Sequence, residues 1–169
     1  MEVERSWGRS KTFTYLHLQF IRQELIKMDS NAVVELKNKA RQNDSGKHRY
    51  CFHENENAEM QEMLFVLPHE WYTRPHKHEH AAESQVVIEG EGYFILFDEW
   101  GNVSETFKIS PQNNFIYRIQ KGLWHMVLPI SEQMVIYEIR ENLIIRQLYL
   151  PNGLQKRMTR LGLNGIWKN

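Results

Sequence analysis

From Gly46 onward, short apolar runs recur roughly every ten residues and alternate with turn-like breaks such as HENEN, DEWGN and SPQNN. Runs such as MLFVL and YFILF carry β-branched and aromatic residues, which favour strands. Many short strands at this spacing are typical of a β-sandwich or a β-barrel, so we expect an all-β fold. Between two of the runs, Gly90-Glu91-Gly92 predicts a hairpin turn.

The region before Gly46 predicts two further elements. Residues 12–20 (TFTYLHLQF) alternate loosely in polarity, which favours a strand. Asp29 or Ser30 can cap one short helix over about residues 30–42. We therefore divide the chain into an N-terminal extension (1–24), one β-domain (25–150) and a mildly basic, solvated C-terminal tail (151–169).

Composition argues against several classes of protein. The 169 residues suit one domain, and 21 basic and 21 acidic side chains give a formal net charge of zero. A general nucleic-acid binder should carry a basic excess, so we expect no such partner. Cys51 is the single cysteine, which fits a reducing compartment. Because no stretch resembles a signal peptide or reaches the ~18 apolar residues of a membrane span, we expect a cytoplasmic protein with no membrane partner.

A histidine cluster follows in RPHKHEH, where His76, His78 and His80 occupy alternate positions. If residues 71–78 are extended, His76 and His78 point to one face, and Pro75 disfavours a helix. Glu83 opens the next apolar run, and a neighbouring strand at about 4.8 Å would bring its carboxylate to the two imidazoles. We expect His80 to lie in the intervening loop and not to be a ligand.

A third imidazole is needed, and His125 in QKGLWHMVLP is the candidate because a barrel can return a distant strand beside the first pair. Three neutral imidazoles and one carboxylate suit one divalent transition metal, such as Fe, Mn, Ni, Cu or Zn. Four protein ligands leave coordination positions open for water or a substrate, as metal-assisted chemistry requires. The alternative is a solvated loop whose histidines bind nothing.

The spacing HxH-x4-E-x6-G from His76 to Gly90 resembles the first motif of the cupin superfamily, and Gly122-x-x-His125 resembles the core of the second. This resemblance implies a cupin-type jelly-roll β-barrel with one short N-terminal helix. It also implies that the metal is held by four ligands: His76, His78, Glu83 and His125.

A closer resemblance covers about residues 25–145 and is to the WbuC family of cupin-fold metalloproteins. It rests on three motifs, RPH, FDEWGNV and LWH. WbuC proteins are encoded among genes of bacterial O-antigen and surface-polysaccharide biosynthesis, so the resemblance implies a role in lipopolysaccharide biosynthesis. Homodimers are common in the cupin fold, and a strand over residues 12–20 could extend a partner's sheet edge. The chain departs from the usual cupin pattern at turn and packing positions, namely Glu70, Gln120 and Pro129.

Strand parity suggests which further side chains join the metal inside the barrel. With Glu83 inward, Gln85 points inward too, where it contacts a ligand or only the backbone. A buried guanidinium at Arg49 would need an anion, either Glu138 or a substrate phosphate or carboxylate. Trp124 is expected to pack in the barrel more than to stack on a ligand. We expect proton transfer by His53 or Glu138, and substrate contacts from Arg49, Gln61, Arg74, Gln85 and Tyr117.

Three functions fit these residues. The first is a small metalloenzyme, such as an isomerase or epimerase, that acts on a sugar or sugar nucleotide. The second is an iron-dependent dioxygenase. The third is a non-catalytic module that binds a sugar or another small molecule and whose metal is structural or absent.

Overall fold

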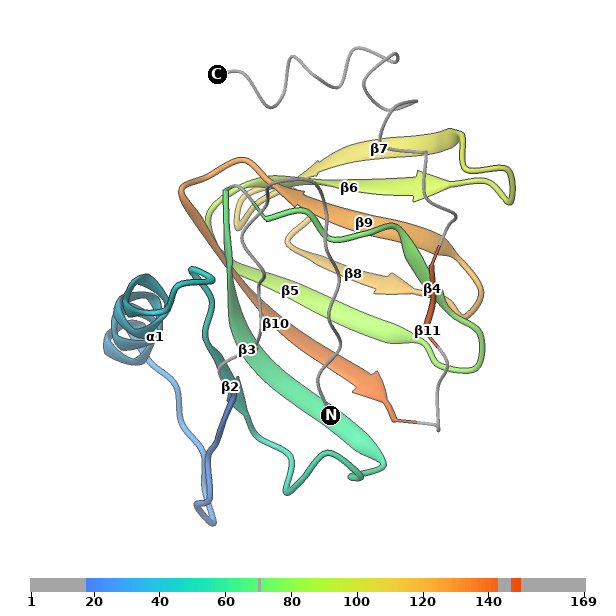
Figure 1. The fold of residues 1–169 in the computed structure, drawn as a ribbon. Coiled ribbons are helices and arrows are strands. Elements are labelled where there is room, and N and C mark those ends of the chain that lie inside the picture. The colour runs from blue at the N-terminus through green and yellow to red at the C-terminus, as the bar shows by residue number, and fades with distance from the viewer. Residues whose placement is uncertain (1–17, 70, 143–146, 150–169) are drawn as a thin grey trace.

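The computed structural model describes residues 18–69, 71–142 and 147–149, whose strands form two sheets that face each other (Figure 1). In order across it, sheet A contains β1 (Leu18–Phe20), β2 (Arg49–Cys51), β3 (Met60–Pro68), β10 (Gln133–Glu141), β5 (Glu83–Glu89) and β8 (Ile116–Ile119). Sheet B contains β11 (Gln147–Tyr149), β4 (His76–His78), β9 (Trp124–Pro129), β6 (Gly92–Phe97) and β7 (Val103–Ile109). The predicted β-barrel fold is confirmed.

One helix, α1 (Ser30–Gln42), lies against the outer face of sheet A (Figure 1). It begins where the sequence predicted, because the Asp29 carboxylate accepts a hydrogen bond of 3.0 Å from the backbone N–H of Ala32. The positive charges of Lys39 and Arg41 in its last turn stabilise the helix, because they lie at the negative end of the helix dipole. Its buried side chains pack on apolar residues of three strands: Tyr50, Leu64, Val66 and Val135.

The inner faces of the two sheets enclose the main hydrophobic core. Along β10, alternate residues Met134 and Ile136 point into it, and Val87 does so from β5. Sheet B contributes Phe94 and Val127 among others. These apolar side chains fill one part of the interior. Farther along the same strands, the inward-facing residues are polar, and they lie near the start of β5: Glu83, Gln85 and Glu138.

The hairpin predicted at Gly90-Glu91-Gly92 is wrong, because β5 and β6 belong to different sheets and the turn carries the chain across the barrel. Gly90 has a φ of +85°, and a Cβ atom there would lie 2.6 Å from the carbonyl oxygen of Gln133. The close approach of the β10 backbone therefore requires glycine. Two apolar runs joined by a glycine turn look the same in the sequence whether or not they pair with each other.

Two other segments differ from expectation. The apolar run at Trp71–Thr73 forms no strand, and β4 starts only after Pro75, which has no N–H to give to a ladder. Of the strand predicted over residues 12–20, Leu18–Phe20 pairs in parallel with β2 of its own chain, and residues 12–17 lie outside the described residues. In the part of the chain that the structure describes, no helix is long and apolar enough to cross a membrane.

Candidate metal centre

Three buried imidazoles meet inside the barrel at one end. His76 and His78 lie on β4, and His125 lies directly opposite His76 on β9. The ring centroids are 4.4 Å apart for His76 and His125 and 5.2 Å apart for His76 and His78. One ring nitrogen from each histidine lies within 4.8 Å of the other two, so these three residues could hold a metal ion.

Hydrogen bonds prepare two of these rings to act as ligands. The Nδ1 atoms of His76 and His125 lie 2.9 Å from the backbone oxygens of Arg74 and Leu123, respectively. Each Nδ1–H therefore donates to the backbone and leaves the Nε2 lone pair available. Nε2 of His125 and Nδ1 of His78 are buried without a hydrogen-bond partner among the described residues. Buried polar atoms rarely lack a hydrogen-bond partner. Imidazole nitrogens are ligands that suit a divalent transition metal, so the three rings fit such an ion.

Glu83 approaches the imidazoles from the opposite sheet. Its Oε2 lies 3.2 Å from Nε2 of His78, and its Oε1 lies 3.3 Å from Nε2 of His125. Glu83 thus contacts two of the three imidazoles, whereas the described residues whose ligand atoms all lie within 4.8 Å of one another are the three histidines alone. The expectation that a strand next to β4 carries Glu83 is wrong, since β5 lies in sheet A and β4 lies between β11 and β9.

The protonation states at the site depend on burial and on the contact of Glu83 with His78 and His125. Burial lowers the pKa of His76 to about 3, and the nearby His125 adds to the effect, so His76 is neutral at physiological pH. Burial opposes ionisation of Glu83, but His125 and His78 outweigh it and lower the pKa of Glu83 below its usual range. Burial opposes protonation of His125 too, but the contact with Glu83 outweighs it and raises the pKa of His125. The site therefore offers a neutral imidazole at His76 and a carboxylate at Glu83, and a metal would have to displace a proton from His125 wherever that ring is protonated.

Gln85 holds Glu83 in place. The Tyr117 hydroxyl donates to Oε1 of Gln85 at 2.6 Å, which orients the amide. Nε2 of Gln85 then donates to Oε1 of Glu83 at 3.1 Å and to Oε2 of Glu138 at 2.8 Å. Both N–H groups are used within the protein, so Gln85, which we expected to contact substrate or backbone, bridges two carboxylates instead.

Glu138 connects this bridge to one cation, Arg140. Burial and the charge of Glu83 raise the pKa of Glu138, so its carboxyl group holds a proton more readily than an ordinary glutamate does. Nε of Arg140 lies 3.9 Å from Glu138, and Nη2 of Arg140 donates to Oε1 of Gln61 at 3.1 Å. Sequence reasoning missed Arg140, although the alternation of β10 places it on the face of Glu138 and could have found it.

Arg49 also points inward, beside the ring of Phe65 at 5.2 Å. Its Nε is buried without a hydrogen-bond partner, and no ion pair with Glu138 is formed within the described residues. His53 is held by the backbone of Glu62, whose N–H lies 3.1 Å from Nδ1, and its ring packs edge-on against Phe20. The structure therefore brings Arg49 into the interior and engages His53 with β3.

The remaining predicted residues lie around this end of the barrel. The Arg74 guanidinium lies 5.2 Å from the ring of Tyr149, and His80 is exposed and lies outside the imidazole cluster. Trp124 is buried on the outer side of sheet B and donates to Glu99 at 3.0 Å, so it packs and does not face the metal centre.

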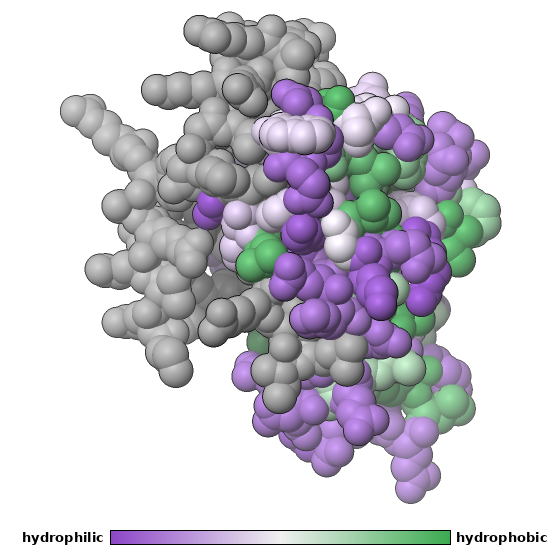
Figure 2. Space-filling view, turned by 90° about the vertical axis from the view of Figure 1, so that its right-hand side faces the viewer, coloured by the Kyte–Doolittle hydropathy of each residue, from purple (hydrophilic) through white to green (hydrophobic). Residues whose placement is uncertain are grey.

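Seen from the side of β4 and β11, the coloured residues form a surface on which hydrophilic side chains predominate (Figure 2).

Comparisons with known proteins support the fold. A family model described as a domain of unknown function, DUF6016, matches residues 28–109. A cupin-2 domain from Rhodospirillum rubrum has a TM-score of 0.51 and 10% identity over 70% of this chain and 75% of that chain. A cupin 2 conserved barrel protein from Rhodopseudomonas palustris has a TM-score of 0.50 and 10% identity over 66% and 72% of the two chains. These likenesses show that the chain has the cupin fold.

A more distant likeness is to a candidate sugar phosphate isomerase from Acidithiobacillus ferrooxidans, with a TM-score of 0.43 and 18% identity. It covers 50% of this chain, and the chain spans only 51% of that protein's length. A similarity this low carries no inference about activity. No curated protein matches the chain.

Proposed function

We propose that this cupin-fold chain is a small metalloenzyme that isomerises or epimerises a sugar or sugar nucleotide. The observation that carries the proposal is the convergence of three buried imidazoles from β4 and β9 with the Glu83 carboxylate from β5. His76, His78, His125 and Glu83 would hold a divalent transition metal, which would supply a Lewis acid for a carbonyl or hydroxyl oxygen of the ligand.

The chain's own residues then account for proton transfer and orientation. Glu138 is the candidate acid or base, because burial and the neighbouring Glu83 raise its pKa toward the range in which a carboxyl group can exchange a proton. Gln85 keeps Glu138 and Glu83 at a constant separation through its two N–H groups. The Tyr117 phenol stays protonated, since burial and the nearby carboxylates raise its pKa well above 10, and so it continues to orient Gln85.

The inward cations suggest an anionic ligand. Nε of Arg49 has no hydrogen-bond partner in the described part of the chain, and a buried guanidinium is stabilised by a phosphate or carboxylate. Arg140 lies beyond Glu138 on the same inward face. A sugar phosphate or sugar nucleotide meets both requirements, with oxygens for the metal and a phosphate for a guanidinium. The proposed setting, cytoplasmic synthesis of bacterial surface polysaccharide, rests on the motif resemblance alone.

The first test is elemental analysis of the full chain purified without a chelator or a histidine tag. We expect about one transition metal per chain, lost in His76→Ala and retained in His80→Ala, which removes an exposed histidine four residues away. If the wild type holds no metal and takes up no added iron, manganese, nickel or zinc, the metalloenzyme proposal fails. A metal-free protein that still binds a sugar would be a binding module.

The second test separates the catalytic alternatives. The metal-loaded chain is incubated with a panel of sugar phosphates and nucleotide sugars in D₂O, and exchange of a carbon-bound proton is followed by NMR. We expect exchange or a new stereoisomer, reduced at least tenfold in Glu138→Gln. Substrate-dependent oxygen consumption by iron-loaded protein, without exchange, would identify a dioxygenase instead.

A further inference from the structure

The inner face of sheet A carries two basic side chains beside β3. Arg49 of β2 pairs with Phe65 of β3, and Phe65 belongs to the main hydrophobic core. The pairing continues one residue before β2, because the backbone N–H of Val66 donates to the oxygen of His48 at 3.1 Å. Side chains alternate along an extended segment, so Lys47 lies on the same inner side as Arg49, about 6.6 Å away along the backbone.

Contacts with aromatic rings agree with this placement. The ammonium nitrogen of Lys47 lies over the ring of Trp71, which packs against the main core. The Arg49 guanidinium lies 5.2 Å from the ring of Phe65. Lys47 is 6% exposed, whereas a lysine is rarely buried without a partner of opposite charge. A ring face stabilises an ammonium group less than the water that burial removes, so these contacts do not by themselves explain the burial.

No carboxylate balances the two cations among the residues that the structure describes. Neither cation forms an ion pair there, and Nε of Arg49 is buried without a hydrogen-bond partner. Glu138 favours the charge of Arg49 from a distance, but burial and the charge of Glu83 raise the pKa of Glu138 itself. Burial, and then the charge of Arg49, lower the pKa of Lys47 to about 6. The inner face of β2 is therefore short of negative charge.

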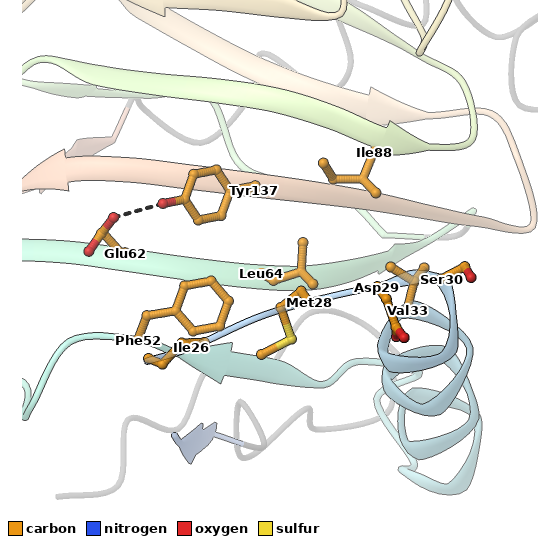
Figure 3. A pocket seen from close by; sticks show the side chains of 10 residues that line it. All are labelled: Ile26, Met28, Asp29, Ser30, Val33, Phe52, Glu62, Leu64, Ile88 and Tyr137. Atoms are coloured by element: carbon orange, nitrogen blue, oxygen red, sulfur yellow. Dashed lines mark hydrogen bonds between the residues drawn. The ribbon is translucent and has the colours of Figure 1, made fainter. Parts of the chain in front are cut away.

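The groove on the other side of the same sheet does not meet this need. It has a volume of about 750 Å³ and lies on the outer face, where Leu64 and Tyr137 line it together with Val33 of α1 (Figure 3). Its charged lining residues are Asp29 and Glu62, which would repel an anion. An anion that neutralises basic side chains is therefore expected at the inner face.

We propose that Lys47 and Arg49 bind the phosphate group of a phosphorylated ligand. The inference rests on the proposed function, since it assigns the phosphate of the sugar phosphate or sugar nucleotide to β2 and its sugar to the metal centre. A phosphate dianion carries enough charge for two cations, and its oxygens suit a planar guanidinium on one side and an ammonium group on another. A carboxylate has a single charge and two oxygens, so it would leave one cation without a counter-ion.

The strand register gives the separation between the two ends of such a ligand. One row across β2, β3, β10 and β5 contains Arg49, Phe65, Ile136 and Val87. Glu83 lies four residues before Val87 on β5, which is about 13 Å along the strand. The metal centre and the phosphate site therefore lie at different levels of the barrel. A ligand that reaches both needs several bonds between its phosphate and the carbon that reacts, as in a hexose 6-phosphate or a sugar nucleotide.

Binding should take up a proton. With a pKa of about 6, the Lys47 amine is mostly neutral at pH 8 in the free protein. A bound phosphate stabilises the ammonium form and raises this pKa, so the amine gains up to about one proton. Among the described residues, Arg49 is the charged group that acts on Lys47, and a guanidinium stays protonated at this pH, so the uptake reports Lys47.

The test is isothermal titration calorimetry of the full chain with inorganic phosphate and with glucose 6-phosphate at pH 8, in two buffers of different ionisation enthalpy. We expect both compounds to bind with proton uptake. Lys47→Met and Arg49→Gln should each weaken binding by about tenfold or more, and Lys47→Met should abolish the uptake. The control is Lys121→Met, which makes the same change at an exposed lysine and should bind phosphate like the wild type.

Both variants should give a folded protein by circular dichroism, because methionine and glutamine replace inward cations with neutral side chains. If Arg49→Gln does not fold, Lys47→Met decides the test by itself through affinity and proton uptake. The proposal is overturned by a wild type that binds neither compound at about 10 mM, or by a folded Lys47→Met that binds phosphate as tightly as the wild type.

His76→Ala separates this proposal from the proposed function, because it removes an expected metal ligand and leaves β2 unchanged. Inorganic phosphate should bind His76→Ala as it binds the wild type, whether or not the wild type holds a metal. Phosphate binding without any metal would therefore support this site while the metalloenzyme proposal fails. Loss of phosphate binding in His76→Ala would place the anion at the metal centre and refute the assignment to Lys47 and Arg49.

Discussion

Replacing Gln85 with leucine tests whether the amide bridge sets the properties of the metal centre. Leucine is close in size to glutamine, but it removes the acceptor of the Tyr117 hydroxyl and the donors to Glu83 and Glu138. Hydrogen bonds to charged groups contribute about 1.5–3 kcal/mol each, and an unpaired buried group costs about 1–3 kcal/mol. Because protonation of Glu138 offsets part of this loss, we expect the free energy of unfolding to fall by about 2–4 kcal/mol.

The effect on metal binding is the sharper measurement. Loss of a partner that orients a ligand typically costs 10–100-fold in metal affinity, which is about 1.4–2.7 kcal/mol. We expect a Gln85→Leu dissociation constant for Zn²⁺ or Mn²⁺ raised by this factor, measured by competition with a fluorescent chelator. Thermal melts with and without metal would then show a smaller metal-induced rise in Tm than in the wild type.

Gln133→Leu is the matched control for Gln85→Leu. Gln133 is buried on β10 and donates one hydrogen bond of 3.2 Å to the backbone oxygen of Lys37, which lies on α1. Its loss should lower the free energy of unfolding while leaving metal affinity unchanged. The reasoning is refuted if folded Gln85→Leu binds metal within twofold of the wild type, or if Gln133→Leu weakens metal binding equally.

Two further substitutions test buried features of the fold. Lys47 is 6% exposed, and burial lowers its pKa to about 6, so between pH 6 and 10 the unfolded state binds more protons. Stability should rise with pH by up to about 1.4 kcal/mol per unit from this group, and Lys47→Met should remove that slope in urea unfolding at pH 7 and 9; equal slopes would contradict it. Gly90→Ala should lower the free energy of unfolding by at least about 2 kcal/mol, because the added methyl group meets the Gln133 carbonyl at φ +85°, whereas exposed Glu79→Ala should cost little.

Much of the local structure could be predicted from the sequence. The Asp29 cap and the apolar positions that follow it predicted α1, which spans residues 30–42 as expected. The alternation along ESQVVIE predicted that Glu83 and Gln85 point inward, and both are buried. The two metal-site motifs predicted which three histidines meet, although His76 and His125 are about 50 residues apart in the chain.

The sequence by itself determined the periodic features, because the spacing of side chains on a strand or helix depends only on neighbouring residues. Only the tertiary structure decided which strands pair, since pairing depends on contacts between residues distant in the chain. It placed Glu83 opposite the histidines and not beside them, and it made Gly90 part of a crossing between sheets. The tertiary structure also decided that Gln85 donates its hydrogen bonds to Glu83 and Glu138, and that Ile116 is exposed. Both depend on which elements pack around a residue.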